Sequence, residues 1–302
     1  MLSVKEYIKQ PRLLLLSLLH HFGFWIPDKW FLQIMYYLYI GRHLNLNNPQ
    51  TFSEKLQWLK LYNHRPEYTI MVDKYAVKDY VAGIIGEEYI IPTLGVWDKP
   101  EAIDYINLPQ KFVLKTAHGG GSCGVLICKE KSHLDKAKIV QYFKKAWKQN
   151  IYNSFREWPY KDVPKRIISE KYLESENGVL DDYKVLCFSG KAKIIEYHAN
   201  RFGPNHTQDF YDTNWNKTSL SQGGLDTVSD LIVDRPTCLE KMLELSESLA
   251  KGIPMCRIDW YITNQKLYFG EITFFDASGF EPFDREEDEI MLGSWIDLSL
   301  CN

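Results

Sequence analysis

Two carboxylates and an arginine towards the end of the chain have the types and spacing of a metal-dependent phosphoryl-transfer site. Asp259 and Glu271 lie in CRIDWYITNQKLYFGEIT (residues 256–273), where a short polar stretch separates two runs rich in β-branched and aromatic residues. If the runs pair as a hairpin, residues placed symmetrically about the turn lie side by side. Mg²⁺ usually takes one or two carboxylates together with substrate phosphates. We therefore predict Asp259 and Glu271 as Mg²⁺ ligands, with Arg257 alternating onto the same face to neutralise a transferring phosphoryl group.

A glycine-rich stretch, FVLKTAHGGGSCGVLIC (residues 112–128), is a candidate phosphate-binding loop. Gly119, Gly121 and Gly124 fit G-x-G-x-x-G, which is a weak signal alone. The apolar VLIC that follows makes the loop a connection between two antiparallel strands, whereas dinucleotide and Walker loops open a helix. Lys115 lies upstream of the glycines, and neither H-R-D nor D-F-G occurs, so a protein-kinase loop is also excluded. We predict a flexible lid of backbone N–H groups over phosphates; a plain glycine-rich turn is the alternative.

The elements that must position these residues follow from periodicity. Strands are predicted at 111–116, 124–129, 166–173, 182–190, 191–200, 256–263 and 265–275, with a short strand within 88–97. Helices are predicted at 13–27, 28–40, 54–62 with Ser53 as the N-cap, 66–86, 133–150 and 235–252. This pattern predicts an α+β protein dominated by antiparallel strands. A helical segment, residues 1–62, would precede a larger domain, residues 63–302.

The bulk composition excludes some classes of function. The chain has 302 residues and a formal net charge of −3, so it has no global cationic field. Nucleic acid as the main partner is therefore not expected, because phosphate neutralisation needs clustered Lys and Arg. The six cysteines form no C-x-x-C pair and no zinc spacing with His. Scattered cysteines are typical of reduced thiols in a cytosolic protein, so a cytoplasmic location is expected.

The apolar segment LLLLSLLHHFGFWIP (residues 13–27) follows three basic residues. A membrane span needs about 20 apolar residues, and His20 and Gly23 interrupt this run early. No small-x-small cleavage motif follows, so a secretory signal is not predicted. Two interpretations stay open. The segment is either a buried packing helix, or an interfacial helix on the inner face of a membrane with its basic end towards anionic lipid.

The order of motifs resembles the ATP-grasp superfamily, and within it the TupA-like branch associated with teichuronopeptide and polysaccharide biosynthesis. The motifs are DKYAVKDYV (73–81), FVLKTAHGGGSCGV (112–125), RIISEKYL (166–173), DYKVLCFSGK (182–191), CRIDWY (256–261) and YFGEITFF (268–275). The resemblance extends from about Thr51 to about Phe283. It implies an ATP-grasp fold with a lid subdomain, about residues 91–168, and a C-terminal subdomain, about residues 169–302, for ATP and metal.

The resemblance also implies roles for residues that would hold ATP. Lys74 and Lys115 would reach the α- and β-phosphates, and Lys184, with Asp182 beside it, would add a third, catalytic cation. The lid residues implied at the phosphates are His118, Gly119, Gly120, Gly121, Ser122 and Gly124, although His118 alternatively caps the hairpin. SEKYLE (169–174) resembles the strand that reads adenine through its backbone. Its Glu170, Lys171 and Leu173 would lie near the purine, and Glu174 near the ribose hydroxyls.

The chain departs from the superfamily at the metal site. Where Glu-x-Asn is common, it has Glu271-Ile272-Thr273, and a threonine oxygen is the poorer ligand; Asp276 is a candidate assistant. The aperiodic stretch 197–216 is a candidate acceptor loop, in which His198 and Arg201 would hold a carboxylate and Trp215 would stack on a sugar; an ordered surface loop is the alternative. The stretch 281–289 is predicted as a solvated acidic face.

The resemblance implies an ATP-dependent carboxylate–amine ligase that uses ATP and Mg²⁺. The γ-phosphoryl group would pass to a carboxylate, and an amine would attack the resulting acyl phosphate. The polysaccharide branch suggests a uronic acid joined to an amino acid or small amine. Three alternatives stay open: a sugar or small-molecule kinase with the same fold, a glycosyltransferase, and a non-catalytic nucleotide-binding partner. A glycosyltransferase often carries D-x-D, which this sequence lacks, its nearest acid pair being Asp181-Asp182.

Overall fold

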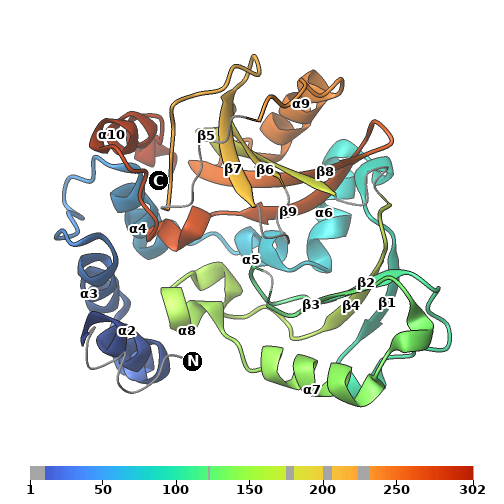
Figure 1. Ribbon diagram of the computed structural model, residues 1–302. Helices are drawn as coiled ribbons and strands as arrows, with labels where there is room; N and C mark the ends of the chain where they lie inside the picture. Colours follow the sequence, from blue (N-terminus) through green and yellow to red (C-terminus); the bar gives the residue numbers. More distant parts are fainter. Residues whose placement is uncertain (1–10, 122, 175–179, 200–205, 224–230, 302) are drawn as a thin grey trace.

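Two antiparallel sheets form the framework of the molecule (Figure 1). The computed structural model describes residues 11–121, 123–174, 180–199, 206–223 and 231–301. Within these ranges the chain forms one sheet of four strands and one of five, with helices packed around both. The predicted α+β class is confirmed.

The four-stranded sheet carries the glycine-rich turn. Its order is β1 (Thr93–Trp97), β4 (Ile167–Lys171), β2 (Phe112–Thr116) and β3 (Val125–Cys128). Helix α7 (Lys136–Ala146) covers its outer face, at the bottom of Figure 1. Ile139 and Phe143 of this helix pack with Phe112 and Leu114 in one apolar cluster. Because side chains alternate along a strand, Lys115 points to the opposite face, towards the rest of the molecule.

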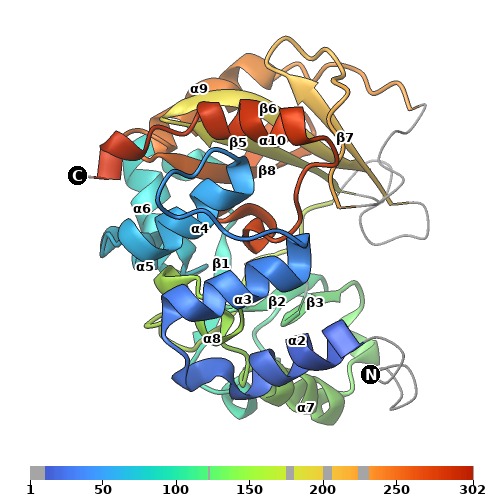
Figure 2. The ribbon, with the colours of Figure 1, turned by 90° about the vertical axis from the view of Figure 1, so that its left-hand side faces the viewer.

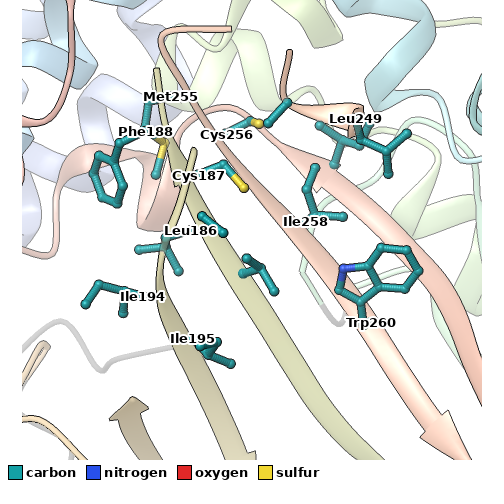
Figure 3. Close-up of a cluster of buried hydrophobic side chains, with 14 of the residues drawn as sticks. Leu186, Cys187, Phe188, Ile194, Ile195, Leu249, Met255, Cys256, Ile258 and Trp260 are labelled. Atoms are coloured by element: carbon teal, nitrogen blue, oxygen red, sulfur yellow. The ribbon is translucent and has the colours of Figure 1, made fainter. Parts of the chain in front are cut away.

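The five-stranded sheet separates an apolar face from a polar one. Its order is β7 (Thr207–Asp212), β6 (Lys191–Ala199), β5 (Asp181–Phe188), β8 (Met255–Thr263) and β9 (Lys266–Thr273). Helix α9 (Leu239–Leu249) packs on the apolar face, where Ile258 and Trp260 lie in the cluster shown in Figure 3. Trp260 Nε1 donates to Ser246 Oγ of α9 at 2.8 Å. Alternation along β8 therefore sends Arg257 and Asp259 to the polar face.

The remaining helices connect and cover the sheets. They are α2 (Pro11–Phe22), α3 (Asp28–Ile40), α4 (Phe52–Tyr62), α5 (Glu67–Val72), α6 (Ala76–Ile85), α8 (Ile151–Phe155) and α10 (Glu286–Ser294). Short 3-10 turns are η1 (Gly23–Trp25), η2 (Glu87–Tyr89), η3 (Pro100–Ala102), η4 (Lys131–His133), η5 (Trp158–Tyr160), η6 (Asp276–Gly279) and η7 (Leu298–Cys301). Figure 2 shows α2 and α3 side by side on one outer face, with α4 and α10 beyond them.

The N-terminal helices bury only one side. Leu16 and Leu19 of α2 pack with Phe31 and Leu32 of α3 and with Phe280 in a second apolar cluster. The packing interpretation is thus correct for that side, while the opposite side stays exposed. No helix in the described part of the chain is both long and apolar enough to cross a membrane. The division of the chain at residue 62 stays a prediction.

All the predicted strands are present, but two helix predictions are wrong in detail. The predicted helix 66–86 is two helices, α5 and α6, separated where Asp73 takes an extended conformation. The N-cap of α4 is Thr51, because Thr51 and Glu54 form a reciprocal capping box. Ser53 is instead buried, and its N–H and hydroxyl donate to Glu289 at 3.0 and 3.2 Å.

Two stretches predicted to be irregular or solvated contain regular structure. The stretch 197–216 holds the edge strand β7, which pairs with β6. The stretch 281–289 opens helix α10, and its Asp288 and Glu289 are buried rather than solvated. Burial raises the pKa of Glu289, although the hydrogen bonds from Ser53 and Phe283 oppose the rise. An acidic run can therefore be a buried contact when another segment supplies the donors.

Candidate functional site

The β8–β9 hairpin places the predicted carboxylates together. Asp259 pairs directly with Glu271 in the strand register, and Arg257 with Thr273. The connecting residues Asn264 and Gln265 both have positive φ, 50° and 58°. This backbone matches a type I′ hairpin turn, whose twist suits the flanking strands and fixes their register. The prediction that Asp259 and Glu271 lie side by side is confirmed.

Arg257 links the carboxylates of this face. Its Nε and Nη2 donate to the two oxygens of Asp259 at 2.7 and 2.9 Å, and Nη1 donates to Asp276 Oδ1 at 2.5 Å. Its Nη2 also lies 3.6 Å from Glu271 Oε1. Burial disfavours the charged guanidinium, but the charges of Asp259 and Asp276 outweigh that effect and raise the pKa of Arg257 well above its usual value. Arg257 is thus held as a fixed cation at the edge of the site.

Lys184 occupies the centre of the sheet. It lies opposite Asp259 on the neighbouring strand, and its Nζ is 2.7 Å from Asp259 Oδ2 and 3.1 Å from Asp182 Oδ2. All three side chains are almost completely buried. Asp259 therefore has both oxygens on cations, Arg257 and Lys184. Glu271 is the more open carboxylate of the pair, with its side chain 27% exposed.

Lys74 joins the sheet to the glycine turn. It lies in the break between α5 and α6, where its backbone N–H donates to Ala117 O at 3.1 Å. Its Nζ donates to Gly119 O at 2.6 Å and is 3.1 Å from Glu271 Oε2. Burial alone would raise the pKa of Glu271, but the charges of Lys74, Arg257 and Lys184 together outweigh it and lower that pKa. The break that the sequence did not predict is what brings Lys74 to both parts of the site.

Glu170 is held between two lysines. Its Oε2 is 2.6 Å from Lys115 Nζ, and its Oε1 is 2.8 Å from Lys78 Nζ. Burial alone would raise the pKa of Glu170, but the charges and hydrogen bonds of Lys115 and Lys78 lower it to about 2. Its side chain is therefore occupied. Because β4 pairs with β1 on one side and β2 on the other, only the backbone beyond Lys171 is left for the predicted adenine contact. Sequence reasoning missed Lys78, which lies on α6, four residues after Lys74.

The glycine turn uses its glycines in different ways. A Cβ on Gly119 or Gly124 would meet Thr116 Oγ1 at 2.4 Å, so these two glycines allow the turn to fold onto β2. Gly121 has φ +61° and open space around its Cα. His118 is buried against Trp147, with ring centroids 5.5 Å apart, and burial with the charge of Lys165 lowers its pKa to about 4. His118 is thus neutral near pH 7 and packs under the hairpin. Ser122 lies outside the described residues.

The other predicted nucleotide residues lie at the far end of β4. Lys171 is exposed, and its N–H donates to Pro92 O at 3.0 Å. Glu174 is exposed and its Oε1 accepts from Lys111 Nζ at 2.6 Å. Leu173 is half-buried. The roles predicted for these residues stay predictions, because none of their observed contacts is specific for a purine or a ribose.

A cavity of about 440 Å³ lies between the glycine turn and the β8–β9 hairpin. Gly120 and Gly121 line it on one side, and Arg257, Glu271 and Thr273 on the other. Residues that sequence reasoning missed complete the wall: Gln149, Asn150, Ile151, Ser154, Phe155, Glu157, Tyr160, Phe275, Ala277 and Ser278. Ala277 and Ser278 have φ of 43° and 54°, a left-handed conformation that is costly for non-glycine residues and is frequent at functional sites.

The predicted acceptor loop is not an open loop where it is described. His198 is buried on β6, with hydrogen bonds to Glu196 and to His206, whose Nε2 is 2.7 Å away. Trp215 is buried and stacks on Tyr211 at a centroid distance of 4.2 Å, and its Nε1 donates to Val233 O. The prediction that Trp215 stacks on a sugar is wrong, because its ring already packs within the fold. Arg201 lies outside the described residues.

The fit of Mg²⁺ rests on two carboxylates. Among the described residues, no group of three or more His, Cys, Asp or Glu side chains forms a metal cluster. A nucleotide-bound Mg²⁺ needs only one or two protein carboxylates, and Glu271, which lines the cavity, supplies one. Asp259 has both oxygens on cations, and its role as the second ligand stays a prediction. Thr273 Oγ1 accepts from Arg257 Nη2 at 3.4 Å, and its role as a ligand stays a prediction.

A family model, among the comparisons with known proteins, shows the family. A family model described as "TupA-like ATPgrasp" matches residues 54–297. No curated protein sequence matches the chain significantly. D-alanine–D-alanine ligase from Helicobacter pylori is 15% identical, with 81% of this chain and 69% of that chain covered and a TM-score of 0.45.

Two further solved structures show comparable similarity. D-alanine–D-alanine ligase from Bacillus anthracis, complexed with ATP, is 14% identical over 86% of this chain and 77% of that chain, with a TM-score of 0.45. D-cycloserine synthetase DcsG is 14% identical over 82% of this chain and 79% of that chain, also with a TM-score of 0.45.

Proposed function

This chain belongs to the TupA-like ATP-grasp family and has the ATP-grasp fold, and from that premise we propose that it is an ATP-dependent carboxylate–amine ligase. The reaction would proceed through an acyl phosphate and release ADP and phosphate. The proposal depends on one observation: the glycine turn, Arg257 and Glu271 all border the same cavity. It brings a candidate phosphate lid and a carboxylate–guanidinium cluster to one space large enough for a small substrate.

The first step transfers the γ-phosphoryl group to the acid. A carboxylate oxygen of the substrate attacks the γ-phosphorus, the bond to the β,γ-bridging oxygen breaks, and ADP leaves. Negative charge develops on the transferring group and on ADP, and fixed cations stabilise it. Arg257, which lines the cavity, and Lys74, which bridges the lid and Glu271, are placed for this role.

Mg²⁺, when bound, would neutralise phosphate charge, and Glu271 with Asp259 would hold it. The contribution of the chain's other groups is positional. The positive charge of Lys184 offsets the negative charges of Asp182 and Asp259 and so stabilises the β8–β9 hairpin. Glu170 orients Lys115 on the lid strand. With no nucleophilic side chain required, catalysis relies on proximity and preorganised charge.

The second step joins the amine to the acyl group. The amine nitrogen attacks the carbonyl carbon, phosphate leaves, and the nitrogen loses its proton, giving an amide. We propose a uronic acid as the carboxylate, on the basis of the polysaccharide branch of the family. The amine would be an amino acid or a small amine.

An ADP-release assay with D-glucuronate and D-galacturonate, each paired with a panel of amino acids, tests the proposal. ADP and phosphate should form only when acid and amine are both present with Mg²⁺. Formation of AMP, or amide formation without ATP, would contradict it. Phosphate retained on a product that contains no amine would instead indicate a kinase.

A further inference from the structure

A buried acid with few hydrogen-bond partners lines the cavity from the segment between α8 and η5. Glu157 is only 5% exposed, yet it belongs to the cavity wall. Ser278 Oγ donates a hydrogen bond to its Oε1. In the described part of the chain, no other hydrogen bond reaches this carboxylate. An ionised carboxyl group can accept about four hydrogen bonds, so a buried one with a single donor is under-satisfied.

Lys60 supplies charge near Glu157 but does not hydrogen-bond to it. It lies on α4 and is 2% exposed. Its Nζ donates to the carbonyls of Phe155 at 2.9 Å and Ser278 at 2.7 Å, and it lies 4.5 Å from the centre of the Phe280 ring. Burial raises the pKa of Glu157, and the charge of Lys60 opposes that rise. Lys60 therefore favours the ionised form while leaving the carboxylate open to another donor.

The charge around the cavity favours a cationic ligand. Among the charged side chains that line the cavity, two are carboxylates, Glu157 and Glu271, and one is a cation, Arg257. Arg257 is already committed to Asp259 and Asp276. An incoming ammonium group brings three N–H donors and a positive charge, which are what Glu157 lacks. A neutral sugar hydroxyl would bring one donor and no charge.

We propose that Glu157 is the recognition residue for the amine substrate, with Ser278 and the buried Lys60 holding its carboxylate at the cavity wall. This inference rests on the proposed ligase function and names where its second substrate binds. The acid and the phosphates would occupy the side of Arg257 and Glu271. The amine would approach from the side of Glu157 and Tyr160, so both substrates would meet within one cavity.

The test compares nucleophiles with and without charge in the wild type and in Glu157→Gln. The acid is D-glucuronate or D-galacturonate. The nucleophile with an ammonium group is glycine, and the nucleophile without one is hydroxylamine, which is neutral near pH 7 and traps an acyl phosphate as a hydroxamate. In Glu157→Gln, the KM for glycine should rise by a factor at least ten times the factor by which the KM for ATP rises. The rate with glycine should fall at least tenfold more than the rate of hydroxamate formation. Glu244→Gln, the same change at an exposed site on α9, is the matched control.

A double variant separates recognition from structure. Glu157→Gln leaves Lys60 without its counter-charge, whereas Glu157→Gln with Lys60→Met removes both charges. If the only role of Glu157 is to neutralise the charge of Lys60, the double variant should have the wild-type KM for glycine. That result would overturn the proposal. An equal KM for glycine in wild type and Glu157→Gln also overturns it, as does a rise confined to the KM of the uronate. A wild type that forms no hydroxamate rejects the ligase itself, a separate result.

A second, independent observation concerns the outer face of α2 and α3. We define the aromatic patch as the exposed residues Leu14, Leu15, Leu18, Phe22, Phe24, Trp25, Trp30, Ile34 and Tyr37. Phe24 and Trp25 are 68% and 74% exposed at the tip between the two helices. Large contiguous apolar patches of this kind mark interaction sites. The two helices form an outer face of the molecule, away from both sheets (Figure 2).

The charge of this segment indicates the partner. Residues 1–43 contain five Lys and Arg against two Asp and Glu, although the whole chain has a net charge of −3. A basic excess in a segment with exposed Trp, Phe and Leu is the composition of a helix that lies in the interface of an anionic membrane. We infer that the aromatic patch docks on an anionic lipid bilayer, with Phe24 and Trp25 inserted among the headgroups.

Vesicle co-sedimentation of the full chain tests this inference. The protein should bind vesicles of phosphatidylglycerol and phosphatidylcholine, bind pure phosphatidylcholine at least fivefold less, and lose binding in the variant Phe24→Ala with Trp25→Ala. Ile106→Ala, which removes an 83% exposed residue of the lid subdomain, should leave binding unchanged. Absence of vesicle binding overturns the inference. So does a wild-type dimer that the double variant converts to a monomer, because a second copy would then cover the patch.

Discussion

Two hairpins border the same cavity and are built in opposite ways. The β8–β9 hairpin closes with the two residues Asn264 and Gln265, and its facing strands carry Arg257, Asp259 and Glu271 in register. The β2–β3 hairpin closes with the long segment 117–124, in which small residues dominate. The first hairpin fixes charged groups relative to one another. The second offers backbone groups and small side chains. Lys74, Tyr142 and Gln149 hold Gly119, Gly124 and Cys123 of its turn, while Gly121 has open space around it.

The two hairpins differ in how rigidly they hold the groups that they carry. Phosphoryl transfer requires cations and carboxylates at fixed separations, and a tight hairpin at one edge of the five-stranded sheet provides them. A lid has to open for substrate and close over it, which a glycine-rich turn permits. Lys74 contacts both hairpins, through Gly119 O and Glu271. It therefore connects the glycine turn to the charged residues of the β8–β9 hairpin.

The largest effect is expected from the tight hairpin. Glu271→Gln should reduce acid- and amine-dependent ADP release by about 10³-fold, since removal of one preorganised group at such a site costs about 10²–10³ in rate. Glu130→Gln, an exposed acid on the side of the lid hairpin, is the control and should stay within about threefold of wild type. Similar losses in both variants would contradict the contrast between the hairpins.

Stability should also depend on the tight hairpin more than on the lid sheet. Lys184→Met leaves Asp182 and Asp259 buried with one cation fewer, which should lower the free energy of unfolding by about 3–5 kcal/mol. Lys111→Met removes an exposed pair with Glu174 in the lid sheet and should cost less than about 1 kcal/mol. Urea unfolding of both variants measures the difference. Equal costs would mean that Lys184 is not the centre of the charge network.

Acid stability tests the cluster of Glu170, Lys115 and Lys78 at the four-stranded sheet. The pKa of Glu170 is about 2 in the folded state, below its ordinary value of 4.5, because Lys115 and Lys78 outweigh the effect of burial. The stabilisation is therefore fully present above pH 4.5 and is lost as the pH falls towards 2. The difference in free energy of unfolding between wild type and Glu170→Gln should shrink through that window. A constant difference would show that Glu170 is not held by the two lysines.

The smallest effect is expected in the glycine turn. Gly121→Ala and Gly252→Ala both place a Cβ at positive φ, +61° and +75°, with nothing within 4 Å. Each should cost about 1 kcal/mol of stability, since the strain is confined to the backbone. Only Gly121→Ala should raise the KM for ATP, by about threefold to tenfold, because Gly252 is remote from the cavity. An unchanged KM for ATP would argue against the turn as a phosphate lid.

Local patterns predicted much of this architecture. The strands follow from β-branched and aromatic runs, and the pairing of Asp259 with Glu271 follows from symmetry about a short turn. Those features depend on residues close in sequence, so the sequence contains the information needed to infer them. The order of the lysine, glycine and carboxylate motifs likewise indicated the family.

The features that the sequence did not reveal depend on tertiary partners. The helix predicted over 66–86 breaks because Lys74 N–H pairs with Ala117 O on the glycine turn. Glu289 is buried because Ser53 supplies donors from a distant helix. Glu157 and Lys60 are ordinary charged residues in the sequence and become informative only through their shared burial. No periodicity encodes contacts of this kind.

The acyl phosphate is the central claim, and transfer of ¹⁸O tests it most directly. The uronate, labelled with ¹⁸O in its carboxylate, is incubated with ATP, Mg²⁺ and the amine, and the released phosphate is analysed by mass spectrometry. The account predicts that each phosphate formed with the amide carries one ¹⁸O atom from the carboxylate. Amide formation with unlabelled phosphate would contradict it, because the carboxylate oxygen would never have been bonded to phosphorus.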